Sequence, residues 1–191
     1  MRNILPLDEN ETVETVLSLN SFDVEGYFVF ATKRGIIKRT AIREYSNINS
    51  SGLIAINLIE GDELMTVKIT DGKADIVLAT NNGQAIRFEE DQVRDTGRAT
   101  QGVIGMKLRE SDYLVGMAVI AEVDKPTAEL LTVSEFGFGK RTPLGEYPSQ
   151  NRGGLGVITM KVTDKTGNLV NLDPVLGDED LFVLSEGGVL I

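Results

Sequence analysis

The feature that most constrains this chain is an internal repeat of about fifty residues. Three stretches align with one another, at residues 28–45, 75–93 and 130–147, and a fourth similar stretch begins at residue 181. Each holds a glycine at the same position, with spacings of 48, 54 and 51 residues between Gly35, Gly83, Gly137 and Gly188. Self-similarity at this period is typical of propellers and related arrays, in which every repeat is one supersecondary unit.

Each repeat divides into two halves, and both halves have the pattern of a β-hairpin. Val, Ile and Thr dominate short apolar runs that end at Gly or Asn, as expected of strands bounded by turns. Asn82-Gly83 is the strongest turn signal, because both residues tolerate positive φ in a two-residue loop. The second halves open with similar runs at 53–58, 103–108 and 157–162. We therefore predict an all-β, propeller-like array of four-stranded blades.

The repeat also predicts how the chain is divided. Three full repeats are expected at 26–74, 75–127 and 128–180. Residues 1–25 fit the end of a preceding blade, and residues 181–191 fit the start of a further repeat. The chain is therefore expected to be part of one longer array. The blade subtype stays open at this point, because a WD40 blade needs His and Trp and the chain has neither.

The composition limits the kinds of catalytic and metal site that the chain can form. The chain has no Cys and no His, so disulfides, the usual zinc ligands and Ser-His or Cys-His nucleophiles are excluded within it. A carboxylate site is conceivable from 29 acidic residues, but their spacing matches no catalytic pair or calcium loop. No apolar run is long enough to span a membrane. We predict a binding module without metal, cofactor or catalytic residues of its own.

The net charge of −10 argues against a nucleic-acid partner only if the charge is evenly spread. It alternates instead: residues 26–45, 83–109 and 137–161 carry +4, +1 and +3. The stretches between them, 57–82, 110–136 and 162–186, carry −3, −5 and −5. Because equivalent positions of a radial array lie on the same side, we expect a basic rim and a more acidic face elsewhere.

An arginine follows each of the first three repeat glycines by four residues, at Arg39, Arg87 and Arg141. Evenly spaced guanidinium groups suit a curved polyanion, so one hypothesis is a phosphate track of outward-projecting side chains with little effect on stability. The alternative is that each arginine protects a strand edge or pairs with a nearby acid, namely Glu44, Glu89 or Glu146. The sequence leaves both open.

Two further arginines, Arg98 and Arg152, lie at the same phase in the loops before the apolar runs at 103–108 and 157–162. The bare amides of Gly153-Gly154 can approach phosphate oxygens, although an ordinary polar loop needing glycine is an equal alternative. The predicted DNA-binding residues are Lys33, Arg34, Lys38, Arg39, Arg43, Arg87, Arg98, Lys140, Arg141 and Arg152.

Several of these segments resemble a known family. ATKRGIIKRTAIREY, IEGDEL, GQAIRFEEDQVRDTGRATQGVIGMKL and GFGKRTPLGEYPSQNRGGLGVITMKV are similar to repeats of DNA gyrase A C-terminal domains, with the related C-terminal domain of topoisomerase IV as the near alternative. The resemblance implies a β-pinwheel, in which neighbouring blades exchange a strand. It also implies a bacterial cytoplasmic, nucleoid-associated role: wrapping duplex DNA for negative supercoiling by a holoenzyme that contains the rest of the gyrase A protein together with the gyrase B protein.

In that family ATP and Mg are used elsewhere in the holoenzyme, so the resemblance implies no cofactor for this chain. The family also carries a glycine-rich box tied to wrapping. Its nearest match retains Gln150, Arg152, Gly153, Gly154 and Gly156 but has Asn151 and Leu155 in place of the flanking basic residues. We interpret it as a degenerate copy. A propeller that binds partner proteins rather than DNA is the alternative function.

Overall fold

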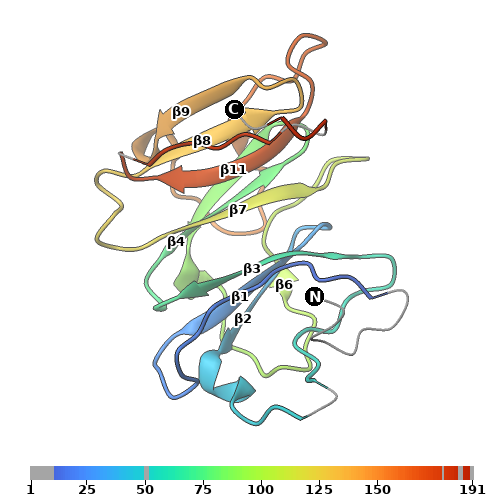
Figure 1. The fold of residues 1–191 in the computed structure, drawn as a ribbon, viewed down its shortest axis with the longest axis vertical. Helices are drawn as coiled ribbons and strands as arrows, with labels where there is room; N and C mark the ends of the chain where they lie inside the picture. The colour runs from blue at the N-terminus through green and yellow to red at the C-terminus, as the bar shows by residue number, and fades with distance from the viewer. Residues whose placement is uncertain (1–10, 50–51, 178, 185–186, 190–191) are drawn as a thin grey trace.

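A computed structural model describes residues 11–49, 52–177, 179–184 and 187–189. These residues form β-strands and three short 3-10 helices, arranged as three antiparallel sheets that follow one another along the molecule (Figure 1). The predicted all-β, propeller-like class is confirmed. The predicted partial repeats at 1–25 and 181–191 fall partly outside the described residues.

Each sheet is built around a hairpin from the first half of a repeat. Blade 1 contains β1 (Tyr27–Thr32), β2 (Ile36–Ala41) and β3 (Leu64–Thr70). Blade 2 contains β4 (Asp75–Thr80), β5 (Gln84–Glu89) and β7 (Leu114–Ile120). Blade 3 contains β8 (Glu129–Ser134), β9 (Gly139–Pro143) and β11 (Leu169–Val175). A 3-10 helix follows each hairpin: η1 (Ile42–Tyr45), η2 (Glu90–Gln92) and η3 (Leu144–Glu146).

The fourth strand of a blade comes from the next repeat. β6 (Val103–Ile104) pairs with β2 in the order β3-β1-β2-β6, and β10 (Val157–Ile158) pairs with β5 in the order β10-β5-β4-β7. The prediction that each second half forms its own hairpin is therefore wrong. The first strand of each second half pairs with the preceding blade, whose outer strand would otherwise present an unpaired edge. The second strand of that half stays in the sheet of its own repeat. This exchange is the arrangement implied by the family resemblance.

The hairpin turns also differ in detail from the prediction. β4 ends at Thr80 and β5 begins at Gln84, so the loop holds three residues rather than two. Gly83 has φ +78°, Asn82 is not among the residues with positive φ, and the Gly83 N–H donates to the Thr80 carbonyl at 2.9 Å. A three-residue loop with glycine in the left-handed region is the next most common hairpin connection.

The apolar core lies between the blades rather than within them. Successive residues of a strand face opposite sides of the sheet, so Ile76 and Leu78 of β4 pack in one cluster with Val29 and Ala31 of blade 1. Val77 on the other face packs with Leu130 and Leu144 of blade 3, in a second cluster. All six residues of β4 are consequently buried. A blade reaches this degree of burial only with a neighbour on each face.

The order of the strands in each sheet decides which strand lies toward the centre of the array and which lies at its outer edge. β7 contacts β3 on one side and β11 on the other, across the three sheets, and β3 and β7 lie side by side in the middle of Figure 1. β6 and β10 lie at the opposite ends of their sheets. The exchanged strands and the loops that precede them therefore form the outer perimeter of the array.

At Gly156 the backbone that leads into the exchanged strand β10 passes very close to β5. This residue has φ +74°, and a Cβ atom placed on it would lie 2.2 Å from the Ala85 carbonyl oxygen. The next residue, Val157, pairs with Ala85. A side chain at position 156 would thus meet both an unfavourable φ and the backbone of the strand that β10 must join.

We predict that Gly156→Ala lowers the thermal midpoint by at least about 4 °C, since strain and collision together cost about 2 kcal/mol or more. Gly145→Ala is the matched control, because a Cβ atom there meets nothing within 4 Å. Differential scanning calorimetry of both variants checks this. Equal midpoints for the two variants would show that close approach at Gly156 does not hold the exchanged strand.

Candidate nucleic-acid interface

The recurring arginines on β2 and β5 point toward the next blade. Arg39 is the cross-strand partner of Val29, and Arg87 is that of Val77; both valines are fully buried where adjacent blades meet. The exposed fractions of the two arginine side chains are 11% and 17%. The expectation that these side chains project outward is wrong for both, because the neighbouring blade covers the face on which they lie.

Arg39 joins blade 1 to blade 2. A guanidinium nitrogen lies 3.6 Å from Glu90, a buried residue of η2, and the group stacks 4.6 Å from the centre of the Tyr27 ring. The Arg39 carbonyl also accepts a hydrogen bond from the Thr96 N–H at 3.0 Å. Glu90 is held in turn by the Ala74 N–H at 3.2 Å. The side chain thus serves the contact between two blades.

Arg87 makes the equivalent connection from blade 2 to blade 3. Its Nε donates to Asp75 at 2.6 Å, and Nη1 donates to the carbonyls of Leu144 and Tyr147 at 3.0 and 3.1 Å. The Asp75 side chain is 2% exposed and also lies 2.9 Å from Lys125. A carboxylate this deeply buried needs a cation close to it, because desolvated charge is costly when unpaired.

Arg141 occupies the same phase but is half exposed. Its Nε donates to Glu129 at 2.7 Å, and its side chain is 49% exposed. The three partners Glu90, Asp75 and Glu129 differ from the predicted Glu44, Glu89 and Glu146, so that expectation is wrong in its residues. The geometry agrees with the alternative that the sequence left open, in which each arginine pairs with an acidic residue.

Lys38 is a second predicted rim residue that lies inside the protein. It is 1% exposed, its Nζ donates to the carbonyls of Ala55 and Arg98 at 2.6 Å each, and it lies 5.2 Å from the centre of the Phe30 ring. Burial lowers the pKa of its ammonium group to about 8. The expectation of a surface cation is therefore wrong here, because Lys38 holds two loops together. That Lys38, Arg39 or Arg87 contacts DNA stays a prediction.

The degenerate box loop, residues 150–156, is hydrogen-bonded to the preceding repeat. The Arg152 N–H donates to Gln92 Oε1, and its guanidinium donates to the carbonyls of Gln92 and Ile104, all at 2.9 Å. The Gln92 amide donates back to the Gln150 carbonyl at 3.2 Å, and the Gly153 N–H donates to Gly105 at 2.6 Å. These contacts lie at the perimeter, where the Arg152 side chain stays partly exposed.

The other predicted residues lie at or near the surface. Lys33 forms an ion pair of 2.5 Å with Glu63, which raises the pKa of its ammonium group, and Arg34 donates to the Glu60 carbonyl at 3.0 Å. Arg98 is half-buried, while the structure leaves Arg43 and Lys140 exposed. The geometry therefore separates cations at blade junctions from cations on the surface.

Among the exposed lysines that were not predicted from the sequence, two share one phase of the repeat. Lys107 and Lys161 each follow the glycine before an exchanged strand by five residues, and both are exposed. Their shared phase in the second halves of two repeats is the signal that could have found them. They extend the set of perimeter cations beyond the two loop arginines.

Two aspartates at turns, Asp62 and Asp112, hold the backbone of neighbouring hairpin loops. Asp62 accepts a hydrogen bond from the Arg34 N–H, and Asp112 accepts the equivalent one from the Asn82 N–H, both at 3.0 Å. Across the described ranges no group of three or more His, Cys, Asp or Glu residues is arranged to hold a metal ion. Over the same part of the chain, no helix is long and apolar enough to cross a membrane.

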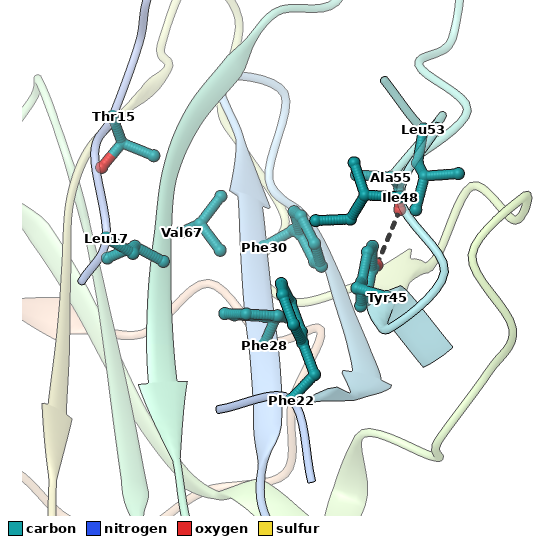
Figure 2. A pocket seen from close by; sticks show the side chains of 10 residues that line it. All are labelled: Thr15, Leu17, Phe22, Phe28, Phe30, Tyr45, Ile48, Leu53, Ala55 and Val67. Atoms are coloured by element: carbon teal, nitrogen blue, oxygen red, sulfur yellow. Dashed lines mark hydrogen bonds between the residues drawn. The ribbon is translucent and has the colours of Figure 1, made fainter. Parts of the chain in front are cut away.

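An apolar hollow lies on blade 1, on the side away from blade 2. Figure 2 shows Phe28, Phe30 and Tyr45 with Val67 around it, and Tyr45 donating to the Ala55 carbonyl at 3.2 Å. Phe28 and Phe30 occupy the repeat positions of Ile76 and Leu78, which blade 1 covers in blade 2. The hollow thus corresponds to an interblade packing face, which explains its apolar lining.

Strand exchange, interblade cores and perimeter cations together define a β-pinwheel repeat protein. The family model described as "DNA gyrase C-terminal domain, beta-propeller" matches residues 26–71, 74–121 and 128–175. The chain therefore belongs to the DNA gyrase C-terminal domain family, a part of that topoisomerase distinct from its catalytic domain.

Relatives agree with this assignment. The chain is 56% identical over 194 residues to the DNA gyrase A protein of Deinococcus deserti, covering 100% of this chain and 24% of that one. Identity to the gyrase A protein of Staphylococcus epidermidis is 43% over 190 residues, covering 99% and 21%. The chain thus spans about a quarter of the length of the curated relatives that it matches.

The fold is shared with two solved domains. The C-terminal domain of DNA topoisomerase IV superposes with a TM-score of 0.89 at 28% identity, covering 99% of this chain and 58% of that domain. A DNA gyrase A C-terminal domain gives 0.87 at 27% identity, covering 100% and 62%.

We predict that Arg87→Gln lowers the free energy of unfolding by about 2 to 3 kcal/mol, because it leaves two carbonyls without a donor and weakens the pairing of a buried carboxylate. Arg141→Gln is the matched control at the same repeat position. Its half-exposed pair should change stability by less than about 1 kcal/mol. Urea unfolding of both variants measures the difference, and equal losses would contradict the assignment of Arg87 to the blade junction.

Proposed function

We propose that this chain binds duplex DNA along its perimeter, as a non-catalytic wrapping segment of a bacterial DNA gyrase. The observation that carries the proposal is the recurrence of exposed or half-exposed cations just before and just after the outer strands of successive repeats: Arg98, Arg152, Lys107 and Lys161. Cations at one phase of a radial array follow a curved path, as a bent polyanion requires. The family membership supports the same ligand.

The overall charge of −10 does not oppose this proposal. The charge is unevenly spread, because residues 83–109 and 137–161, which hold these cations, carry +1 and +3, while 110–136 and 162–186 carry −5 each. What a duplex meets is the local field within about a Debye length of the perimeter, roughly 8 Å at physiological salt. Phosphate contacts of this kind carry no base information, so we expect binding that is insensitive to sequence.

Several finer statements belong to this proposal. The surface residues Lys33, Arg34, Arg43, Lys140 and Arg141 are candidates for further phosphate contacts. The repeats are proposed to run 26–74, 75–127 and 128–180, within one domain. The partners would be duplex DNA, the rest of the gyrase A protein and the gyrase B protein, in the bacterial cytoplasm and at the nucleoid.

A protein-interaction module remains the second candidate, and the apolar hollow of blade 1 is the observation in its favour. Its lining residues, however, occupy repeat positions that are covered by an adjacent blade elsewhere in the chain. The hollow is therefore better explained by packing between blades, and we favour the DNA ligand.

We predict that the double variant Lys107→Gln, Lys161→Gln lowers the magnitude of the slope of log affinity against log salt by roughly 2, since each phosphate contact contributes about 0.9. Filter binding of one duplex by the 191-residue chain across a salt series measures the slope. Lys73→Gln removes an exposed charge from the turn between β3 and β4 and should leave the slope unchanged. No DNA binding by the unaltered chain, or a similar slope change per lysine for Lys73, would overturn the proposal.

A further inference from the structure

A row of exposed isoleucines lies on the perimeter. Ile54, Ile104 and Ile158 each follow a repeat glycine by two residues, and they are 69%, 49% and 70% exposed. Single exposed apolar side chains are ordinary on protein surfaces. Folding does not explain the same exposed residue at the same phase three times, because a polar β-branched residue such as Thr satisfies the strand equally well.

Ile104 lies in a patch built from two repeats. The Arg152 guanidinium donates to the Ile104 carbonyl at 2.9 Å, and the Lys107 N–H donates to the Gly154 carbonyl at 2.9 Å. A Cβ atom on Gly153 would lie 3.8 Å from Ile104 Cγ2, so the glycine loop runs directly beside the isoleucine. The Ile104 side chain thus lies beside a loop that carries the Arg152 guanidinium and that is hydrogen-bonded to the backbone of the exposed Lys107, three residues further along the chain.

This combination of groups fits one part of a duplex. Proteins that bend DNA commonly place Ile, Leu or Phe against the minor groove, beside Arg and Lys that neutralise the flanking phosphates. Bending around a convex edge turns some minor grooves inward, where sugars and base edges offer apolar surface between two phosphate backbones. An isoleucine gains little from a phosphate alone, so its exposure among cations favours the groove.

We propose that Ile104, and Ile158 in the following repeat, pack against the minor groove of the wrapped duplex while Arg152, Lys107 and Lys161 contact the flanking phosphates. The inference rests on the proposed function and adds to it which residues promote bending. Ile54 is a weaker member of the row, because Asn57 replaces the lysine at its repeat and donates to the Ala99 carbonyl at 3.1 Å.

The test compares the double variant Ile104→Thr, Ile158→Thr with the unaltered 191-residue chain. Affinity for a duplex is measured over a salt series, and bending is measured by energy transfer between dyes at the duplex ends. Val170→Thr on β11 is the control, since Val170 is an exposed β-branched residue of a strand that lies toward the centre of the array. Thr keeps the β-branch, so the thermal midpoint should stay unchanged.

We expect affinity to fall by roughly threefold to tenfold, as partial loss of apolar burial implies, with less bending and an unchanged salt slope. The lysine double variant should instead change the slope. Ile→Val at both positions should retain binding, and this variant keeps the test valid if the Thr variant folds poorly. A Thr variant that binds and bends like the unaltered chain, or a Val variant as weak as a folded Thr variant, would overturn the inference. Failure of the unaltered chain to bind DNA would instead overturn the proposed function.

Discussion

The interaction on which the rest of the structure depends is the burial of each blade face against the next blade. β4 has no exposed residue because blade 1 covers one face and blade 3 covers the other. The exchanged strands reinforce this contact: Val103 and Val157 close the outer edges of the preceding sheets with backbone hydrogen bonds. Neither the faces nor the edges of a blade are satisfied by its own repeat, as in other repeat proteins where stability comes from neighbours.

This constraint also explains where the charged residues lie. A cation on the face of β2 or β5 lies at a blade junction, so Arg39 and Arg87 are largely covered and pair with the carboxylates of Glu90 and Asp75. A cation that follows the exchanged strand, such as Lys107, lies on the outside of the array. The same repeat period therefore serves two purposes, joining blades on the inside and presenting charge at the perimeter.

The fold class could be predicted from the sequence because glycine spacing and short β-branched runs are local signals. The exchange of strands could not be deduced from the residues, since it depends on which sheet has a vacant edge and not on the pattern of Val103–Ile104 itself. Periodicity placed Arg39 and Arg87 at one phase, but it does not distinguish a surface phase from a buried one. Only the packing of neighbouring blades decides that, and it places both side chains at blade junctions instead of directing them outward.

The central claim is that DNA follows the exchanged strands and their loops, while the faces of the blades remain occupied with packing. Amide hydrogen exchange with and without a saturating duplex tests this most directly, because it reports protection segment by segment. The account predicts slower exchange on DNA binding in 98–107 and 152–161, with no change around Phe28 and Phe30. Protection of the apolar hollow on blade 1, with the perimeter segments unchanged, would contradict it.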